Sequence, residues 1–275
     1  MKRVMTIAGS DSGGGAGIQA DLKTFSAFGV YGMSAVTAVT AQNTQTVEAI
    51  FPLSPELVSL QIRTVAKDIG IDGVKTGMLG NREVAEVVSE EISTLGLVKV
   101  VVDPVMVAKS GDLLLKEEAI VTVAQHLLPL SHLVTPNLHE ASMLSGLKVE
   151  TIDDMKKACR RIRDLGPRNV LVKGGHLTGF ELVDILFDGE NYHSFPGKRI
   201  DTPHTHGTGC TFSAALCALL VLGRPIVQAV REARQYMELV ISHALPLGKG
   251  HGPTNHLAPL FLHNGKDPME GGKIW

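Results

Sequence analysis

The 275-residue sequence has few cysteines, no long apolar run and no surplus of charge of either sign. Its three cysteines, Cys159, Cys210 and Cys217, lack C-x-x-C spacing, so they predict neither a disulfide framework nor a zinc ribbon. No apolar run approaches the ~18 residues that cross a bilayer, and residues 1–9 lack the apolar stretch of a signal peptide. We therefore expect a protein of the reducing cytoplasm without a membrane partner.

A basic surplus is also missing. The 26 Lys and Arg residues are balanced by 28 Asp and Glu residues, which leaves a net charge of −2. Because nucleic-acid binding needs a basic patch for phosphate contacts, we expect no nucleic-acid partner. The composition, 44% hydrophobic and 20% charged, is globular. Glycine is abundant: its 29 residues exceed the usual roughly 7%, so binding sites made of backbone groups are expected.

Short apolar runs alternate with amphipathic helical patterns along most of the chain. Strands are predicted at residues 4–8, 34–39, 46–51, 74–76, 98–102, 133–135 and 170–173. Helices are predicted after residue 17, from Ser54 to about 68, from Asn81, at 117–128, after Pro136, at 151–165, at 208–222 and at 225–244. Ser54, Asn81 and Thr151 are typical N-terminal caps, and Gly29 suits a helix C-terminus.

Residues 182–187 and 192–195 predict an antiparallel hairpin, since Asp188-Gly189 between them suits a two-residue type I′ turn. The remaining alternation predicts an α/β fold, with a mostly parallel central sheet covered by helices on both faces. A single domain over residues 1–256 is expected. Residues 257–275 are predicted to form a C-terminal tail.

Polar side chains follow three of the predicted strands. Asp103 follows 98–102, Asn137 and Glu140 follow 133–135, and Lys173 ends 170–173. Ligands of open α/β sheets bind at the carboxyl ends of the strands, which is where these residues fall. Each has a structural alternative: a turn for Asp103, a helix cap for Asn137, a solvated strand end for Lys173. Their coincidence on one edge favours a binding site.

The first glycine-rich loop resembles a dinucleotide fingerprint, because residues 15–20 (GAGIQA) satisfy G-x-G-x-x-A. That motif also requires an acidic residue about 20 positions later. Residues 35–41 contain none. The phosphate-loop motif G-x-x-x-x-G-K-[ST] is absent as well, so the first loop does not predict a nucleotide site by itself.

The second glycine-rich loop, residues 205–210 (THGTGC), precedes an apolar helix. Its two glycines let N–H groups converge at a helix N-terminus, which predicts an anion hole for a transferred phosphoryl group. A thiol there is expected to have a lowered pKa, so Cys210 is a candidate base. The alternative is a small buried residue, as Cys159 and Cys217 are expected to be. His204 and His206 lack a third ligand, which favours loop residues over a metal site.

Several motifs together resemble the bacterial hydroxymethylpyrimidine/phosphomethylpyrimidine kinases of the ribokinase-like superfamily. The resemblance covers roughly residues 4–256 in order. The segments that carry it are 6–11 (TIAGSD), 13–24 (GGGAGIQADLKT), 41–44 (AQNT), 75–79 (KTGML), 103–106 (DPVM), 135–141 (TPNLHEA), 173–176 (KGGH) and 206–211 (HGTGCT).

The resemblance implies ATP-dependent phosphorylation of 4-amino-5-hydroxymethyl-2-methylpyrimidine, and then of its monophosphate, in thiamine biosynthesis. It implies Mg²⁺ as a cofactor and suggests a homodimer. The implied catalytic residues are Gly207, Thr208, Gly209 and Cys210, with Cys210 where most of the superfamily has a catalytic Asp. The implied ATP- and phosphate-binding residues are Asp103, Asn137, Lys173 and Thr205. The implied metal-binding residues are Asn137 and Glu140. The implied pyrimidine-binding residues are Gly9, Asp21, Gln42 and Met78.

Two departures limit this resemblance. Residues after about 257 have no counterpart in the family pattern, and the loop at 10–13 (SDSG) also occurs in cysteine-type pyridoxal kinases. A kinase for pyridoxal or pyridoxine is therefore the main alternative. A non-catalytic sensor of a vitamin precursor is disfavoured, because ligand binding alone needs none of Asn137, Glu140, Lys173 and Cys210.

Overall fold

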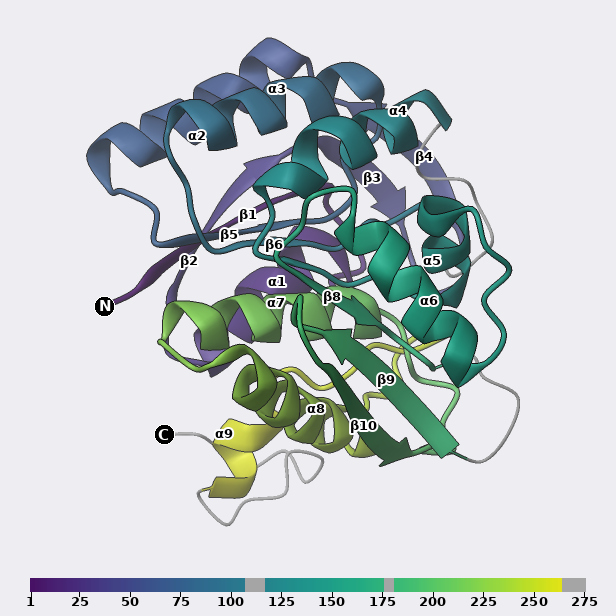
Figure 1. The fold of residues 1–275 in the computed structure, drawn as a ribbon. Coiled ribbons are helices and arrows are strands. Elements are labelled where there is room, and N and C mark those ends of the chain that lie inside the picture. The colour runs from purple at the N-terminus through teal and green to yellow at the C-terminus, as the bar shows by residue number, and fades with distance from the viewer. Residues whose placement is uncertain (107–116, 176–180, 264–275) are drawn as a thin grey trace.

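Parallel strands form the centre of the computed structural model, which describes residues 1–106, 117–175 and 181–263 (Figure 1). The eight-stranded sheet has the order β10-β9-β8-β7-β6-β5-β1-β2, in which β9 is antiparallel to both of its neighbours, β8 and β10, and the other neighbouring strands are parallel. The strands are β1 (Arg3–Ala8), β2 (Tyr31–Val36), β5 (Gly73–Thr76), β6 (Val100–Val102), β7 (Leu133–Val134), β8 (Asn169–Val172), β9 (Glu181–Phe187) and β10 (Tyr192–Lys198). The predicted mostly parallel sheet is confirmed.

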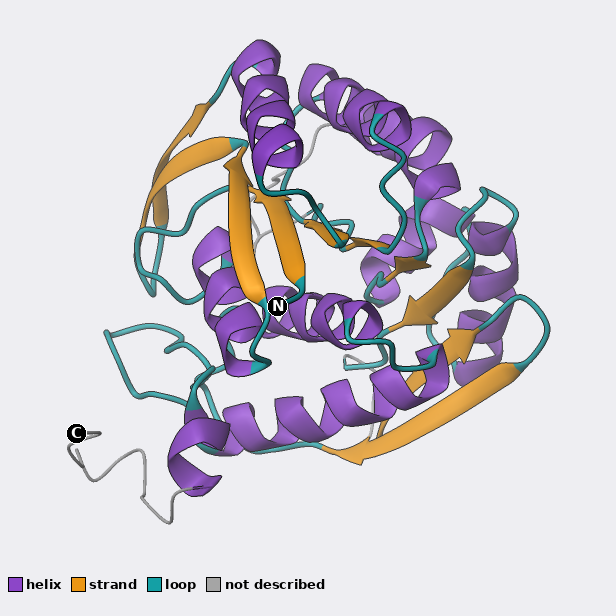
Figure 2. Ribbon diagram, turned by 90° about the vertical axis from the view of Figure 1, so that its left-hand side faces the viewer, coloured by secondary structure: helices purple, strands orange, loops and turns teal. Residues whose placement is uncertain are grey.

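Both faces of the sheet are covered because successive residues of each strand point to opposite sides. In β6, Val100 and Val102 join one core while Val101 joins the other. The first core is closed by α2 (Pro55–Asp68), α3 (Arg82–Thr94), α4 (Glu117–Thr122), α5 (Leu138–Ser145) and α6 (Ile152–Arg163). The second core is closed by α1 (Gly17–Ala27), α7 (Thr208–Val221) and α8 (Ile226–Ser242), on the opposite side of the strands in Figure 2.

Local chemistry sets the helix ends as predicted. The Ser54 and Asn81 side chains accept bonds from the first turns of α2 and α3. Thr151 forms a capping box with Asp154 at the start of α6. Gly29, two residues after α1, has φ +68°, a conformation that glycine adopts without a Cβ penalty.

Three elements have bounds in the structure that differ from the predicted ones. The strand predicted at 98–102 begins only at Val100, and Val98 is 74% exposed. The helix predicted at 117–128 is α-helical only to Thr122 and continues as π and 3₁₀ turns, as expected near Pro129 because proline cannot donate a helical hydrogen bond. The β9–β10 connection covers the four residues 188–191: the Asp188 N–H donates to Asn191 O (3.2 Å), and the Asp188 side chain accepts from the N–H groups of Glu190 and Asn191.

The strand predicted at 34–39 is in fact two strands that separate at Thr37. The Thr37 hydroxyl donates to Met78 O (2.7 Å) and its N–H to Ala8 O (3.0 Å), so the chain is held there. Beyond it, β3 (Ala38–Gln42) leaves the main sheet and pairs with β4 (Val47–Pro52) in an antiparallel ribbon that the sequence did not predict.

A short helix, α9 (Ala258–His263), lies within the range predicted to be a tail and packs near α8. The division into a domain over 1–256 and a tail from 257 stays a prediction. Among the described helices, none has the length and apolar character needed to cross a bilayer.

Candidate active site

A buried ion pair lies where the parallel strands end. Lys173 Nζ donates to Asp103 Oδ1 (3.0 Å), which also accepts from the Thr135 hydroxyl (3.2 Å). The second oxygen of Asp103 accepts from the Ser213 hydroxyl of α7 (3.2 Å). Burial by itself raises the pKa of Asp103, but the charges of Lys173 and Lys75 outweigh it and hold that pKa below its usual value. Asp103 is therefore an ionised, fully bonded carboxylate.

Asn137 and Glu140 bond to each other at the start of α5. Asn137 Oδ1 accepts from the Glu140 N–H (3.0 Å), and Glu140 Oε2 accepts from the Asn137 N–H (2.8 Å). The helix-cap alternative for Asn137 is thus what the structure shows. Burial raises the pKa of Glu140 to about 7, against the opposing effect of Lys173. Glu140 therefore titrates close to neutral pH.

The second glycine-rich loop forms the N-terminus of α7 as predicted. Gly207 is the N-cap with φ +80°, and the first helical bond runs from the Thr211 N–H to Gly207 O (2.9 Å). The N–H groups of Gly209 and Cys210 precede that bond, so they are the free donors of a helix N-terminus. A Cβ on Gly209 would lie 3.7 Å from both Asp103 Oδ2 and Lys173 Nζ, so these donors adjoin the ion pair.

The expected lowering of the Cys210 pKa is wrong for the protein without ligands. Burial raises the pKa of this thiol to about 11, and the nearby Lys75 charge offsets only part of that effect. A helix N-terminus favours a thiolate, but removing the thiolate from water costs more here. Cys210 is protonated at neutral pH. Cys159 and Cys217 are fully buried, as expected for core residues.

Three of the expected pyrimidine-binding residues lie near the two glycine-rich loops. Gly9 donates its N–H to Met78 O (3.2 Å), and a Cβ on Gly9 would overlap the Met78 side chain. Gln42, at the end of β3, exchanges two backbone bonds with the Ser12 hydroxyl (2.7 and 2.9 Å). Its carboxamide oxygen contacts only the Thr40 hydroxyl weakly among described residues (3.5 Å), which leaves the group available to a ligand.

Asp21, the fourth of these residues, is fully buried beneath the site rather than on a pocket wall. Its Oδ2 accepts from Lys75 Nζ (2.9 Å) and from the Thr6 hydroxyl (2.6 Å), and neither charged side chain is exposed. No described residue bonds its Oδ1. Sequence reasoning missed the role of Lys75, although a lysine in the middle of the predicted strand 74–76 was a usable signal, since fully buried lysines are paired.

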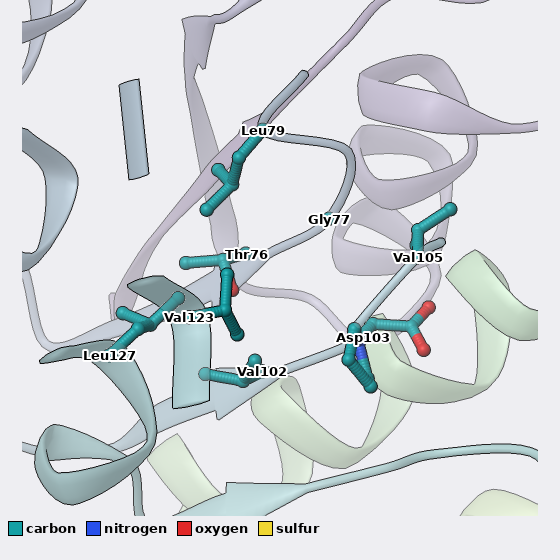
Figure 3. A pocket seen from close by; sticks show the side chains of 9 residues that line it. Thr76, Gly77, Leu79, Val102, Asp103, Val105, Val123 and Leu127 are labelled. Carbon is teal, nitrogen blue, oxygen red and sulfur yellow. The ribbon is translucent and has the colours of Figure 1, made fainter. Parts of the chain in front are cut away.

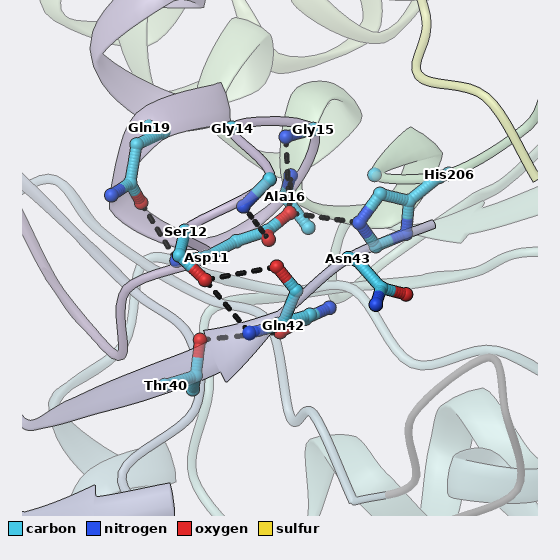
Figure 4. Close-up of polar contacts among 12 residues, drawn as sticks. Asp11, Ser12, Gly14, Gly15, Ala16, Gln19, Thr40, Gln42, Asn43 and His206 are labelled. Atoms are coloured by element: carbon cyan, nitrogen blue, oxygen red, sulfur yellow. Dashed lines mark hydrogen bonds and ion pairs between the residues drawn. The ribbon is translucent and has the colours of Figure 1, made fainter. Parts of the chain in front are cut away.

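Asp11 organises the first glycine-rich loop (Figure 4). Its carboxylate accepts from the N–H groups of Gly13 (2.9 Å), Gly15 (3.0 Å) and Ala16 (2.7 Å). It also bonds His206 Nε2 (2.8 Å). The N–H groups of Gly13, Gly15 and Ala16 are therefore occupied by the chain's own carboxylate. Sequence reasoning did not single out Asp11.

A small cavity lies behind Asp103 (Figure 3). Its volume is about 10 Å³, and it is lined by Thr76, Gly77, Leu79, Val102, Asp103, Pro104, Val105, Val123 and Leu127. This is the size of one water molecule and too small for a substrate. The Thr76 hydroxyl is buried without a hydrogen-bond partner in the described part of the chain.

Comparison with known proteins then decides the family. A model of the family described as phosphomethylpyrimidine kinase matches residues 11–255. The chain belongs to this family. The hydroxymethylpyrimidine/phosphomethylpyrimidine kinase of Bacillus subtilis is 48% identical over 257 residues, which cover 93% of this chain and 95% of that protein. The thiamine biosynthesis bifunctional protein ThiED of Geobacter sulfurreducens is 48% identical over 254 residues, but the chain spans only 52% of its length.

Solved structures agree with the predicted ribokinase-like fold. An ADP complex of Bacillus subtilis pyridoxal kinase has a TM-score of 0.88 at 42% identity, with 94% of this chain and 99% of that chain covered. The phosphomethylpyrimidine kinase of Clostridium difficile has a TM-score of 0.79 at 44% identity, with 88% and 100% covered. Proteins similar to this chain thus include ones named for each of the two substrates that the sequence left open.

The raised pKa of Glu140 predicts a pH-dependent stability. In the unfolded chain this carboxyl titrates near 4.5, and in the folded protein near 7. The folded state binds the extra proton between these values, so wild-type stability falls as pH rises from about 4.5 through 7. Glu140→Gln should remove this loss. The free energy of unfolding of the variant, minus that of wild type, should therefore increase by about 1–3 kcal/mol between pH 5 and pH 8.

Urea denaturation of both proteins at each pH from 5 to 8 measures this difference. Glu91→Gln is the matched control, because Arg63 and Ser59 hold the pKa of Glu91 below its usual value despite burial. Its stability relative to wild type should stay nearly constant over this range, since a carboxyl with a lowered pKa is ionised in both the folded and the unfolded state above about pH 5. A difference between Glu140→Gln and wild type that is constant with pH would contradict the assignment.

Proposed function

We propose that this protein uses ATP to phosphorylate 4-amino-5-hydroxymethyl-2-methylpyrimidine and then its monophosphate, in thiamine biosynthesis. The observation that carries the proposal is the placement of the free N–H donors of α7 against the Asp103–Lys173 pair at the carboxyl edge of the sheet. Phosphoryl transfer depends on positioning and on stabilising charge that develops in the transition state. Family membership supports the choice of substrate.

The proposed roles follow from this placement. The N–H groups from Gly207 to Cys210 stabilise the charge on the transferred phosphoryl group. Lys173 and Thr205 bind the ATP phosphates, and Asp103 supports this phosphate site by holding Lys173 beside Gly209 of the anion hole. Gly9, Gln42 and Met78 bind the pyrimidine. Asp21 acts from beneath by holding Lys75.

The fit of Mg²⁺ to Asn137 and Glu140 is poor as the side chains stand. Each is already bonded to the other's backbone N–H, and Glu140 is 4% exposed. Across the described ranges, no three His, Cys, Asp or Glu side chains are grouped as a metal site. Mg²⁺ usually keeps several waters and binds through substrate phosphates. We propose that it arrives with ATP and that these two residues support the phosphate site instead of ligating the metal.

Pyridoxal is the second candidate substrate. The likeness to a pyridoxal kinase bound to ADP favours a site that accepts either nitrogen heteroaromatic alcohol. Incubation of the purified protein with ATP, Mg²⁺ and each alcohol in turn, with kcat/KM measured for both, decides between them. We expect the aminopyrimidine to be preferred. A clear preference for pyridoxal would overturn the proposal, and ligand binding without turnover would favour the sensor.

We also propose that the protein is a cytoplasmic homodimer. The β3–β4 ribbon presents four apolar side chains to solvent on one face: Val39 opposite Phe51 and Ala41 opposite Ala49. Val39 is 50% and Phe51 71% exposed. A two-stranded ribbon has little stability alone, and exposed apolar patches mark interaction surfaces. A second copy of this chain is the proposed partner for the face.

Light scattering after size-exclusion chromatography tests this assignment. Wild type should elute with twice the chain mass, and Phe51→Lys should shift towards the monomer. Val98→Lys is the matched control, since Val98 is equally accessible (74% exposed) but lies outside the ribbon. A monomeric wild type, or a dimer unaffected by Phe51→Lys, would refute the interface.

The role of Cys210 as proton acceptor predicts a steep pH profile. With a free-enzyme pKa of about 11, its thiolate fraction at neutral pH is small. Wild-type kcat/KM should therefore rise roughly tenfold per pH unit between pH 7 and 9. Cys210→Ala should lower kcat by about 10²–10⁴ with ATP affinity retained, and Cys210→Asp should flatten the profile.

Cys217→Ala, on the same helix but in the core, is the control for packing loss. A fully active Cys210→Ala enzyme, or a flat wild-type profile, would remove Cys210 as the base. The backbone donors of the anion hole would then be the main catalytic element.

The carboxamide of Gln42 is expected to set substrate choice. An aminopyrimidine offers a ring nitrogen acceptor beside an amine donor, and one carboxamide can pair with both. Pyridoxal has a phenolic oxygen in place of that amine. Gln42→Met should lower kcat/KM for the aminopyrimidine about 10–100-fold, as expected when polar groups that the bound substrate shields from water lose their hydrogen bonds, and affect pyridoxal far less. Gln45→Met, in the adjoining exposed turn, is the control. Equal losses for both alcohols would refute the pairing.

A further inference from the structure

His206, in the loop before α7, bonds to two other segments of the chain, one through its side chain and one through its backbone. Its ring Nε2 bonds Asp11 Oδ2 (2.8 Å) in the first glycine-rich loop. Its backbone N–H donates to Gly252 O (3.1 Å), and its carbonyl accepts from the Thr254 N–H (3.4 Å). The His206 side chain is 15% exposed and that of Asp11 2%, so water competes little for the bond between them.

The two glycine-rich loops touch at this point. A Cβ on Gly207 would overlap Gly15 O, and a Cβ on Gly15 would lie 2.5 Å from His206 Cδ2. Gly207, at the start of the anion hole, therefore lies directly against the backbone of the first loop. Because the two loops are in direct contact, we expect a shift of the first loop to displace the N-cap of α7.

The first loop also reaches the expected acceptor pocket. Next to Asp11, the Ser12 hydroxyl donates to Gln42 O (2.9 Å) and accepts from the Gln42 N–H (2.7 Å). Hydrogen bonds thus join Gln42 to Ser12 and Asp11 to His206, and Ser12 and Asp11 are neighbours in the chain, so the connection reaches the residue before the anion hole (Figure 4). Residues distant in sequence thus connect the acceptor pocket at Gln42 with the anion hole at the start of α7.

We infer that His206, through its bond to Asp11, is a positioning residue that fixes where the anion hole lies relative to the pocket for the alcohol acceptor. The inference rests on the proposed phosphoryl transfer. Misplacement of catalytic donors by about 1 Å costs up to 10²-fold in rate. Because His206 holds the loops together without touching ATP in this assignment, its loss lowers kcat and leaves the KM for ATP nearly unchanged.

The test compares four proteins: wild type, His206→Ala, His206→Gln and His193→Ala. Glutamine retains an N–H donor at a similar reach. His193→Ala is the matched control, because His193 Nε2 bonds Asp188 Oδ2 (2.7 Å) in the β9–β10 hairpin, outside the site. We expect His206→Ala to lose about 10–100-fold in kcat with KM for ATP within about threefold. His206→Gln should recover most of the rate, and His193→Ala should keep it.

A second measurement needs no turnover. Cys210 is partly accessible whereas Cys159 and Cys217 are buried, so the rate of iodoacetamide labelling of the native protein reports on the anion hole. Labelling should rise at least about fivefold in His206→Ala and not in His193→Ala, as expected for a loosened loop. His206→Asn, too short to reach Asp11, replaces His206→Ala if the alanine variant does not fold.

The outcomes separate this inference from the proposed function. A wild type that phosphorylates neither alcohol contradicts the proposed function. The labelling comparison would still test whether the bond between His206 and Asp11 holds the two loops together. A folded His206→Ala protein with wild-type kcat and unchanged labelling overturns the inference. Equal losses in His206→Ala and His206→Gln would do the same, since the bond to Asp11 would then not matter.

Discussion

The ion pair between Asp103 and Lys173 is the interaction on which the site depends. It joins the ends of β6 and β8, and through Thr135 and Ser213 it also holds the end of β7 and the first turns of α7. Loss of one partner would leave a buried charge, at a cost of about 3–5 kcal/mol. The fold therefore holds a cation and the free N–H groups of Gly209 and Cys210 in one place before any ligand binds.

Burial decides which groups around this pair are charged. Asp103 has two lysines nearby and stays ionised, whereas Glu140 and Cys210 lack sufficient compensation and have raised pKa values. The unpaired acids are thus neutralised, or nearly so, while the lysines remain charged and the helix N-terminus keeps its partial positive charge. Such a site favours an incoming polyanion without a surplus of basic residues, which is consistent with a net charge of −2.

Short-range chemistry explains much of what the sequence predicted correctly. Alternating apolar patterns identify the strands and helices, and both the mostly parallel sheet and the caps at Ser54, Asn81 and Thr151 follow from neighbouring residues. The motif around Gly207 identifies the N-terminus of α7 because a left-handed N-cap requires glycine. The strand break at Thr37 escaped prediction, since it depends on bonds to Ala8 and Met78.

By itself, then, the sequence determined the fold class, the family and which polar residues end the strands. Only the tertiary structure decided which of the polar residues bond to one another and how burial changes their pKa values. The pairing of Lys75 with Asp21, 54 positions apart, and of His206 with Asp11, 195 positions apart, leaves no local pattern. The Cys210 pKa likewise reverses its expected direction because burial, which exists only after folding, outweighs the helix N-terminus that the sequence displays.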